Sequence, residues 1–214
     1  KDIQAAVNSL VAQGGTGNVH IPAGTFNFVN VGESWQKVNI PAGVSLFGAP
    51  TQRYANGSVI QWNTILVMPW EVPSGWSSAS VWFQFNGNQD PAKPSRFSEI
   101  KSVGYRSRQP TSTQMSLGIS IYGVIDFRVD HSSFENLGYG GVSLFPDTLN
   151  LKARGVIDHN RFNNTHGWND PASYVNGNIG YGVQLHRAYS GVAFDPTMNV
   201  LGKYTDYTVF IEDN

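Results

Sequence analysis

The spacing of apolar residues changes soon after the chain begins. From Asp2 to Val11 they recur at helical spacing, with Asp2 as a candidate N-cap and Gly14-Gly15 as a stop. We therefore expect a capping helix over residues 2–13. From residue 18 onward, short runs rich in β-branched and aromatic residues follow, separated by Gly, Pro and Asn: Val19–Phe28, Val38–Phe47, Ile65–Met68 and Val81–Phe85.

Two strand patterns recur and alternate along the chain. The first aligns at steps of 29, 28 and 54 residues in Ile100–Tyr105, Val129–Phe134, Ile157–Phe162 and Ile211–Asn214. The second occurs in Phe83–Phe85, Ile119–Ile121, Val142–Leu144 and Val183–Leu185. Alternating copies at such spacing predict a solenoid with one coil per repeat, in a single domain covering residues 1–214. A leucine-rich repeat has a similar length, but its Leu/Asn spacing is absent.

Stacked coils would bury together the apolar residues that no coil can bury alone, with each strand parallel to its copies. Alternation predicts the inward stacks Ile119/Val142/Val183, Ile121/Leu144/Leu185, Val129/Ile157/Ile211 and Phe134/Phe162. Ser132, Asn160 and Asn214 share one turn position, where side-chain amides can bond from coil to coil.

The first coils resemble a known family. Asp2–Phe26 (DIQAAVNSLVAQGGTGNVHIPAGTF) and Asn39–Ala49 (NIPAGVSLFGA) are similar to the N-terminal cap and first coils of the pectate-lyase-like superfamily, and VDHSSFEN and IDHNRFNN resemble its coil repeat. The resemblance covers nearly the whole chain and implies an all-β fold, a single-stranded right-handed parallel β-helix with a short capping α-helix. The superfamily contains polysaccharide lyases, glycoside hydrolases, phage tailspikes and surface adhesins, so fold alone does not choose the activity.

Composition narrows the range of partners. With 14% charged residues and a net charge of −1, the chain has no basic surface typical of nucleic-acid binding. It has no Cys, and no apolar run of about 18 residues that would span a membrane. The sequons Asn56-Gly-Ser58 and Asn163-Asn-Thr165 permit an extracellular or cell-surface location.

The ends suggest a fragment. The chain begins at Lys1 without Met and ends within the strand-like Tyr207–Asn214. We therefore expect a C-terminally incomplete β-helix, whose open last strand could pair with another copy.

One outward column is predicted to hold Lys101, Asp130, Asp158 and Glu212. Carboxylates one coil apart, about 4.8 Å, repel by about 3 kcal/mol at an effective dielectric of about 20. A cation, raised pKa values or a nearby Arg would offset this repulsion. The functional interpretation is a Ca²⁺ or substrate-cation site formed by Asp130, Asp158 and Glu212, or an acid/base pair for glycoside chemistry. A solvated column balanced by Lys101, Arg128, Arg154 and Arg161 is the alternative.

His131 and His159 occupy matching positions one residue further on, with Asp213 in the next copy. They could supply a general base, hold a metal, or serve as turn residues bonded to the backbone. The candidate catalytic residues are thus Arg128, Asp130, His131, Asp158 and His159.

A third column contains Asn86, Tyr122, Phe145 and His186. Outward aromatic rings suit sugar binding, or they form a lateral core beneath long loops. Inserted loops are expected at residues 69–80, 164–181 and 187–207, and loops carry function in solenoids. The candidate substrate-binding residues are therefore Tyr122, Phe145, His186, Trp168 and Tyr174.

Three functions remain open. The first is an extracellular carbohydrate-active protein that binds a polysaccharide and cleaves it by β-elimination or hydrolysis. The second is a non-catalytic surface or adhesion protein that binds glycans, and the third is a trimeric tailspike. Of the polygalacturonase strings, Asp-Asp, Gly-His-Gly and Arg-x-Lys are absent, which leaves the enzyme question open.

Overall fold

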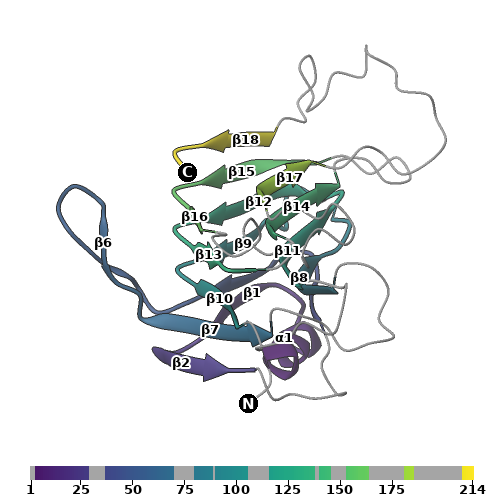
Figure 1. Cartoon of the computed structure of the whole chain (residues 1–214). Coiled ribbons are helices and arrows are strands. Elements are labelled where there is room, and N and C mark those ends of the chain that lie inside the picture. Colours follow the sequence, from purple (N-terminus) through teal and green to yellow (C-terminus); the bar gives the residue numbers. More distant parts are fainter. Residues whose placement is uncertain are drawn as a thin grey trace, which may run out of the picture.

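The computed structural model describes residues 3–28, 37–69, 80–88, 90–105, 116–137, 140–145, 153–163, 181–185 and 209–214. Within these residues one short helix, α1 (Ile3–Ala12), precedes eighteen strands. Three parallel sheets contain most of the strands, and one antiparallel hairpin contains the rest (Figure 1). The protein is therefore all-β apart from its N-terminal helix, as the sequence predicts.

The strands of each parallel sheet lie in a regular spatial order. Sheet A consists, in that order, of β1 (Gly17–His20), β4 (Val44–Phe47), β9 (Ser95–Ser98), β12 (Ile125–Asp130), β15 (Arg154–Asp158) and β18 (Val209–Glu212). Sheet B consists of β2 (Gly24–Asn27), β7 (Thr64–Pro69), β10 (Lys101–Tyr105), β13 (Ser133–Glu135) and β16 (Arg161–Asn163). Sheet C consists of β3 (Val38–Ile40), β8 (Ser80–Phe85), β11 (Ser116–Tyr122), β14 (Gly140–Phe145) and β17 (Tyr181–Leu185).

The chain visits these sheets in a fixed cyclic order. It runs from a strand of sheet A to one of sheet B, then to one of sheet C, and then returns to sheet A. We call one such circuit a pass. Neighbouring strands in every sheet come from consecutive passes and pair in parallel, so the architecture is consistent with a β-solenoid.

The strand register confirms that the predicted stacks align, although Ile211, on the edge strand β18, is 42% exposed and not buried. Val129 pairs with Ile157 and Ile157 with Ile211, while Ile119 pairs with Val142 and Val142 with Val183. The other two stacks, Ile121/Leu144/Leu185 and Phe134/Phe162, are also in register. Phenylalanine rings continue this core: Phe97 and Phe134 lie 6.1 Å apart between ring centroids, and Phe134 and Phe162 lie 5.4 Å apart. Strand alternation thus places one side chain per pass in each stack.

Sheet C makes room for the Phe162 ring with glycine. A Cβ atom on Gly182 would lie 2.9 Å from Cγ of Phe162, and one on Gly141 would lie 2.6 Å from Cε1 of the same ring. Both distances are shorter than ordinary contacts between carbon atoms. The ring of sheet B therefore packs directly against the backbone of sheet C.

The predicted N-terminal helix is confirmed as α1, which ends at Ala12, one residue before the expected end. It packs Val7 into the core, and Ile3 and Leu10 lie against the core from its side. It ends before Gly14 and Gly15, which have φ angles of 130° and 88° that favour glycine. The expected N-cap Asp2 lies outside the described residues.

Two of the predicted strand runs each contain a corner. Residues 19–28 divide into β1 and β2 at Ile21-Pro22, and residues 38–47 divide into β3 and β4 at Pro41. Proline cannot donate a ladder hydrogen bond, so the chain turns there. The alignment of Ile100 with Val129 is also wrong, because Val129 pairs with Phe97. Apolar and polar residues alternate in both β9 and β10, so the sequence around Val129 can be aligned with this region in more than one register.

One pass replaces its corner between sheets A and B with a hairpin. Strands β5 (Gln52–Arg53) and β6 (Val59–Gln61) pair antiparallel between β4 and β7, and the hairpin projects away from the sheets (Figure 1). Its base is held by Glu99, whose Oε2 accepts the Thr51 N–H at 2.9 Å. Tyr54 and Ile60 are 60% and 50% exposed on this arm.

Other expectations concern the remainder of the chain. The loops expected at 69–80, 164–181 and 187–207 fall almost entirely outside the described residues. Strand β18 lies at the edge of sheet A, where its pairing with another copy stays a prediction. In the part that the structure describes, no helix is long and apolar enough to cross a membrane.

Candidate functional site

The corner between sheets A and B repeats in successive passes. In the corners that follow β9, β12 and β15, and directly after β18, one residue has a left-handed backbone, with φ between 48° and 61°: Glu99, His131, His159 and Asp213. Two residues connect the end of β12 to the start of β13, and the same number connect β15 to β16. This sharp turn needs a left-handed residue, which costs non-glycine residues about 1–2 kcal/mol. The corner therefore presents these four side chains in one row.

The next residue of the corner forms a side-chain ladder. The N–H of Ser132 donates to Oδ1 of Asn160 at 3.1 Å, and the N–H of Asn160 donates to Oδ1 of Asn214 at 3.1 Å. Each amide nitrogen then donates to a carbonyl of the preceding pass, Asn160 to Val129 at 2.8 Å and Asn214 to Ile157 at 2.9 Å. These bonds confirm the predicted turn position and satisfy polar groups inside the corner.

The acidic column is neutralised by arginine. Nε of Arg96 donates to Oδ1 of Asp130 at 2.7 Å, and Nη2 of Arg96 donates to Oδ2 of the same group. Arg128 binds Asp158 in the same way, at 3.0 and 2.6 Å. The two carboxylates are 0% and 3% exposed. An arginine of one pass thus holds the aspartate of the next pass, in the place where the sequence suggested Ca²⁺.

These pairs keep all four groups charged. Burial would raise the pKa of Asp130, but hydrogen bonds from Arg96 and His131 outweigh it and hold that pKa below its usual range. The pKa of Asp158 is lowered for the same reasons by Arg128 and His159. Hydrogen bonds to the aspartates raise the pKa of Arg96 and Arg128. A general acid or base needs a pKa near the working pH, so these groups suit charge pairing better than proton transfer.

Each aspartate also orients a histidine. Nδ1 of His131 lies 2.7 Å from Oδ2 of Asp130, and Nδ1 of His159 lies 2.7 Å from Oδ2 of Asp158. Because an ionised carboxylate only accepts, Nδ1 carries a hydrogen, and in the neutral ring the lone pair is then on Nε2. The rings stack at 4.9 Å between centroids with 3° between their planes, and their side chains are 30% and 50% exposed. We call these two Asp–His pairs the dyads.

The structure corrects the rest of the predicted column. Lys101 lies in sheet B, pairing with Ser133 and binding Glu135 at 2.9 Å, and Ser98 takes its expected place beside Asp130. Glu212 does follow Asp158 in register but is exposed. Among the described residues, no three His, Cys, Asp or Glu side chains are grouped so that they could hold a metal ion. The set of Asp130, Asp158 and Glu212 is therefore not grouped around a metal position.

Arg96 is the member of the site that sequence reasoning missed. It pairs in register with Arg128, so Arg96-Phe97-Ser98 is the copy of Arg128-Val129-Asp130 one pass earlier. Aligning those two strings would have found it. Of the other arginines named from the sequence, Arg154 binds Asp126 through Nε at 2.8 Å, and Arg161 is exposed.

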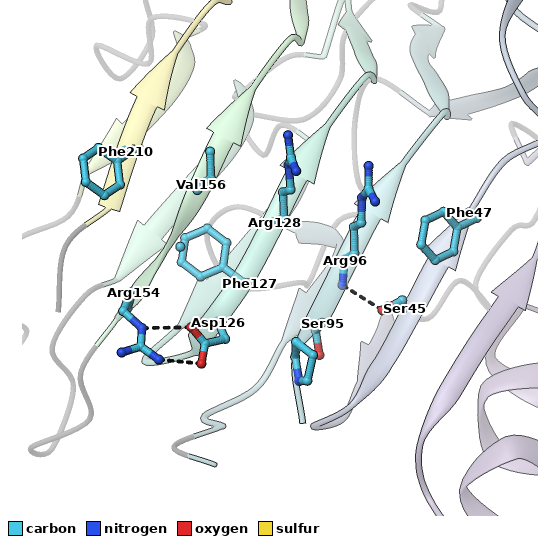
Figure 2. A pocket seen from close by; sticks show the side chains of 12 residues that line it. Ser45, Phe47, Ser95, Arg96, Asp126, Phe127, Arg128, Arg154, Val156 and Phe210 are labelled. Carbon is cyan, nitrogen blue, oxygen red and sulfur yellow. Dashed lines mark hydrogen bonds and ion pairs between the residues drawn. The ribbon is translucent and has the colours of Figure 1, made fainter. Parts of the chain in front are cut away.

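An open hollow of about 460 Å³ lies on the outward face of sheet A beside the arginine pair (Figure 2). The side chains of Arg96 and Arg128 point the same way from neighbouring strands, and the Arg154–Asp126 pair closes the opposite side. Phe47 lies at the β4 end and Phe210 at the β18 end. The lining residues are Ser45, Phe47, Pro94, Ser95, Arg96, Asp126, Phe127, Arg128, Arg154, Gly155, Val156 and Phe210.

The aromatic column on sheet C has a different character. Tyr122 and Phe145 pair in register, and their rings stack at 4.2 Å between centroids with 4° between planes. Sugars pack on the faces of rings, whereas in this column each ring covers a face of the other. This geometry favours a lateral ladder over a sugar platform. The other substrate-binding candidates, Trp168, Tyr174 and His186, lie outside the described residues.

Comparison of the chain with protein-family models, with curated proteins and with solved structures finds no match. Any function must therefore be inferred from the corner between sheets A and B and from the adjoining hollow.

Proposed function

We propose that the chain is an extracellular carbohydrate-active protein, built as a right-handed parallel β-helix of the pectate-lyase-like type, that binds a polysaccharide along the outward face of sheet A. Two observations and one general rule support the architecture. The chain visits the sheets in cyclic order, the pairing is parallel throughout the three sheets, and parallel crossover connections are right-handed in about 98% of cases.

The observation that carries the function is the extent of the hollow. Its lining comes from five consecutive strands of sheet A, β4 to β18. Four steps between parallel strands measure about 19 Å at about 4.8 Å each. A linear polymer lying across these strands would meet similar groups at each step. Guanidinium groups for hydroxyl or acidic oxygens and phenylalanine rings for apolar faces both line the surface, as in other ligand sites.

The dyads are the groups that could add chemistry to binding. Nε2 of His131 or His159 could accept a proton as a general base, while the aspartate fixes the tautomer and steadies the ring. Asp130, Asp158 and Arg128 would then position the histidines. Because those three groups stay charged, they are suited to charge pairing and not to proton transfer. This favours a second candidate, a surface protein that binds glycans without cleaving them.

A panel of acidic and neutral polysaccharides tests the proposal. Binding would be measured with the full chain, and products would be followed by mass spectrometry. Val156→Trp should fill the hollow and replaces no member of an ion pair, and we expect it to weaken binding tenfold or more. Ile60→Trp, on the hairpin, is the matched control and should bind like the parent.

The outcomes separate the candidates. Products that disappear in His159→Asn would identify an enzyme that uses the dyads. Binding with no product would identify a glycan-binding protein. Failure to bind across the panel, or equal binding by Val156→Trp and the parent chain, would refute the proposed site.

A further inference from the structure

The row of corner side chains holds two imidazoles prepared in the same way. In both His131 and His159 the Nδ1–H is taken by an aspartate at 2.7 Å, which leaves Nε2 as the atom with a lone pair. Metal-binding histidines commonly donate their second nitrogen to a carboxylate, which fixes the tautomer and raises the basicity of the ligand atom. Both dyads already have a carboxylate bound to the Nδ1 atom of the histidine, and they lie in two successive passes.

We propose that Nε2 of His131 and Nε2 of His159 together bind one divalent transition-metal ion such as Zn²⁺, Ni²⁺ or Cu²⁺. Neutral imidazole suits these metals, whereas Ca²⁺ and Mg²⁺ prefer oxygen. This metal site does not depend on the proposed polysaccharide function. It also differs from the cation site suggested by the sequence, because the carboxylates orient the ligands and do not touch the metal.

The two rings lie side by side but would have to turn toward each other to share one ion. The rings are parallel and 4.9 Å apart between centroids. With metal–nitrogen bonds of about 2.0–2.1 Å and tetrahedral angles, the two Nε2 atoms must approach to about 3.3 Å. The rings must therefore tilt toward each other, and their partial exposure, 30% and 50%, leaves space for this.

Water would complete the coordination. The positions before and after the histidine pair in the row hold carboxylates, Glu99 and Asp213, each with the same left-handed backbone. As the described side chains stand, no third ligand converges with the two rings. A site with two protein ligands binds more weakly than a structural zinc site with four, so the ion would be exchangeable.

The ion would join two passes of the chain. His131 lies in the corner between β12 and β13, and His159 lies in the corner between β15 and β16. A metal that binds both nitrogens binds the folded chain and not the unfolded one, because unfolding separates residues 28 positions apart in the sequence. It should therefore stabilise the fold in proportion to the logarithm of its concentration.

The test uses the full chain stripped with a chelator and titrated calorimetrically with ZnCl₂ alone. We expect one ion per chain at the corner and a rise in melting temperature on adding zinc. His131→Asn and His159→Asn should each weaken this binding tenfold or more and remove the thermal shift. Asn is chosen because it adopts the left-handed backbone more readily than most residues.

His20 gives the matched control. Its ring stacks on Phe47 at 5.6 Å on another part of sheet A, and His20→Asn should bind zinc like the parent chain. Circular dichroism would confirm that each variant is folded, and the single variants serve as substitutes for each other if one is not. The proposal is overturned if the parent chain takes up no zinc at millimolar concentration, or if the double variant His131→Asn/His159→Asn binds zinc as the parent does.

Discussion

Nδ2 of Asn160 lies 3.1 Å from Oδ1 of Asn214, so two residues 54 positions apart in the sequence are hydrogen-bonded across one step of the corner ladder. Asn160 also donates to the Val129 carbonyl and accepts the Ser132 N–H. Since the side chain is buried, its loss leaves several polar groups without partners. We expect Asn160→Ala to lower the free energy of unfolding in urea by about 2–4 kcal/mol.

The preceding pass supplies the control for this prediction. Ser132 occupies the equivalent position there, and its Oγ accepts the Ile100 N–H at 3.4 Å. Asn160→Ser should therefore retain part of the ladder and cost clearly less than Asn160→Ala. Equal losses for the two variants would show that the ladder contributes little.

Removal of Arg96 should expose the cost of an unpaired buried carboxylate. Asp130 is fully buried and would keep only its weaker contacts with Arg128 and His131. We expect Arg96→Ala to destabilise the protein by about 1–3 kcal/mol, measured by urea unfolding. Arg161→Ala, at an exposed position of β16, should change stability by less than about 0.5 kcal/mol. The double variant Arg96→Ala/Asp130→Asn should recover stability relative to Arg96→Ala, and a further loss would contradict the assignment.

The same pairs predict sensitivity to acid. The pKa values of Asp130 and Asp158 are lower in the folded protein than the usual value of about 3.9. Their stabilising contribution is therefore complete above that value and is lost as the pH falls through the folded-state pKa values. The free energy of unfolding in urea should be measured on the metal-free chain between pH 7 and pH 2, two limits on either side of about 3.9. We expect it to fall steeply toward the acid limit. Asp130→Asn should be less stable than the parent at neutral pH, but its free energy of unfolding should fall less on acidification. If that free energy depended on pH as steeply as in the parent, this would argue against the paired carboxylate.

A larger side chain at position 182 should destabilise the protein only while Phe162 is present. The three atoms nearest to a Cβ atom there all belong to the Phe162 side chain, at 2.9 to 3.2 Å. We expect Gly182→Ala to cost about 1–3 kcal/mol through overpacking. In a Phe162→Ala background the same substitution should cost much less, and the double-mutant cycle gives the coupling. Additive effects would mean that the ring does not limit this position.

Most of the fold prediction rested on the internal repeat in the sequence. Val129 and Ile157 are buried in one stack, and Ile211 continues their register on the edge strand, because successive passes place apolar residues at the same position and this repeats in the sequence. The ladder position of Asn160 was predictable for the same reason. Lys101 was misplaced because the step between β9 and β12 is 32 residues, as between Ile100 and Ser132, and alternation alone fits more than one step.

The partners within the site were harder to predict. Arg96 and Asp130 are 34 residues apart, and Arg128 and Asp158 are 30 apart. Such a pair can be recognised only after the register of both passes is known. The orientation of rings is likewise a property of packing: the sequence placed Tyr122 beside Phe145, but only the folded structure reveals that each ring covers the other.

The hairpin of β5 and β6 has a consequence for engineering. It is inserted at a corner where later passes turn within two residues, yet β4 and β7 on either side of it keep their parallel pairing with β9 and β10. At such a corner, the connection can become longer without changing the register of the strands that it joins. Foreign peptides grafted between Tyr54 and Ser58 should consequently be displayed at the end of a stiff arm, with the stacked strands left undisturbed.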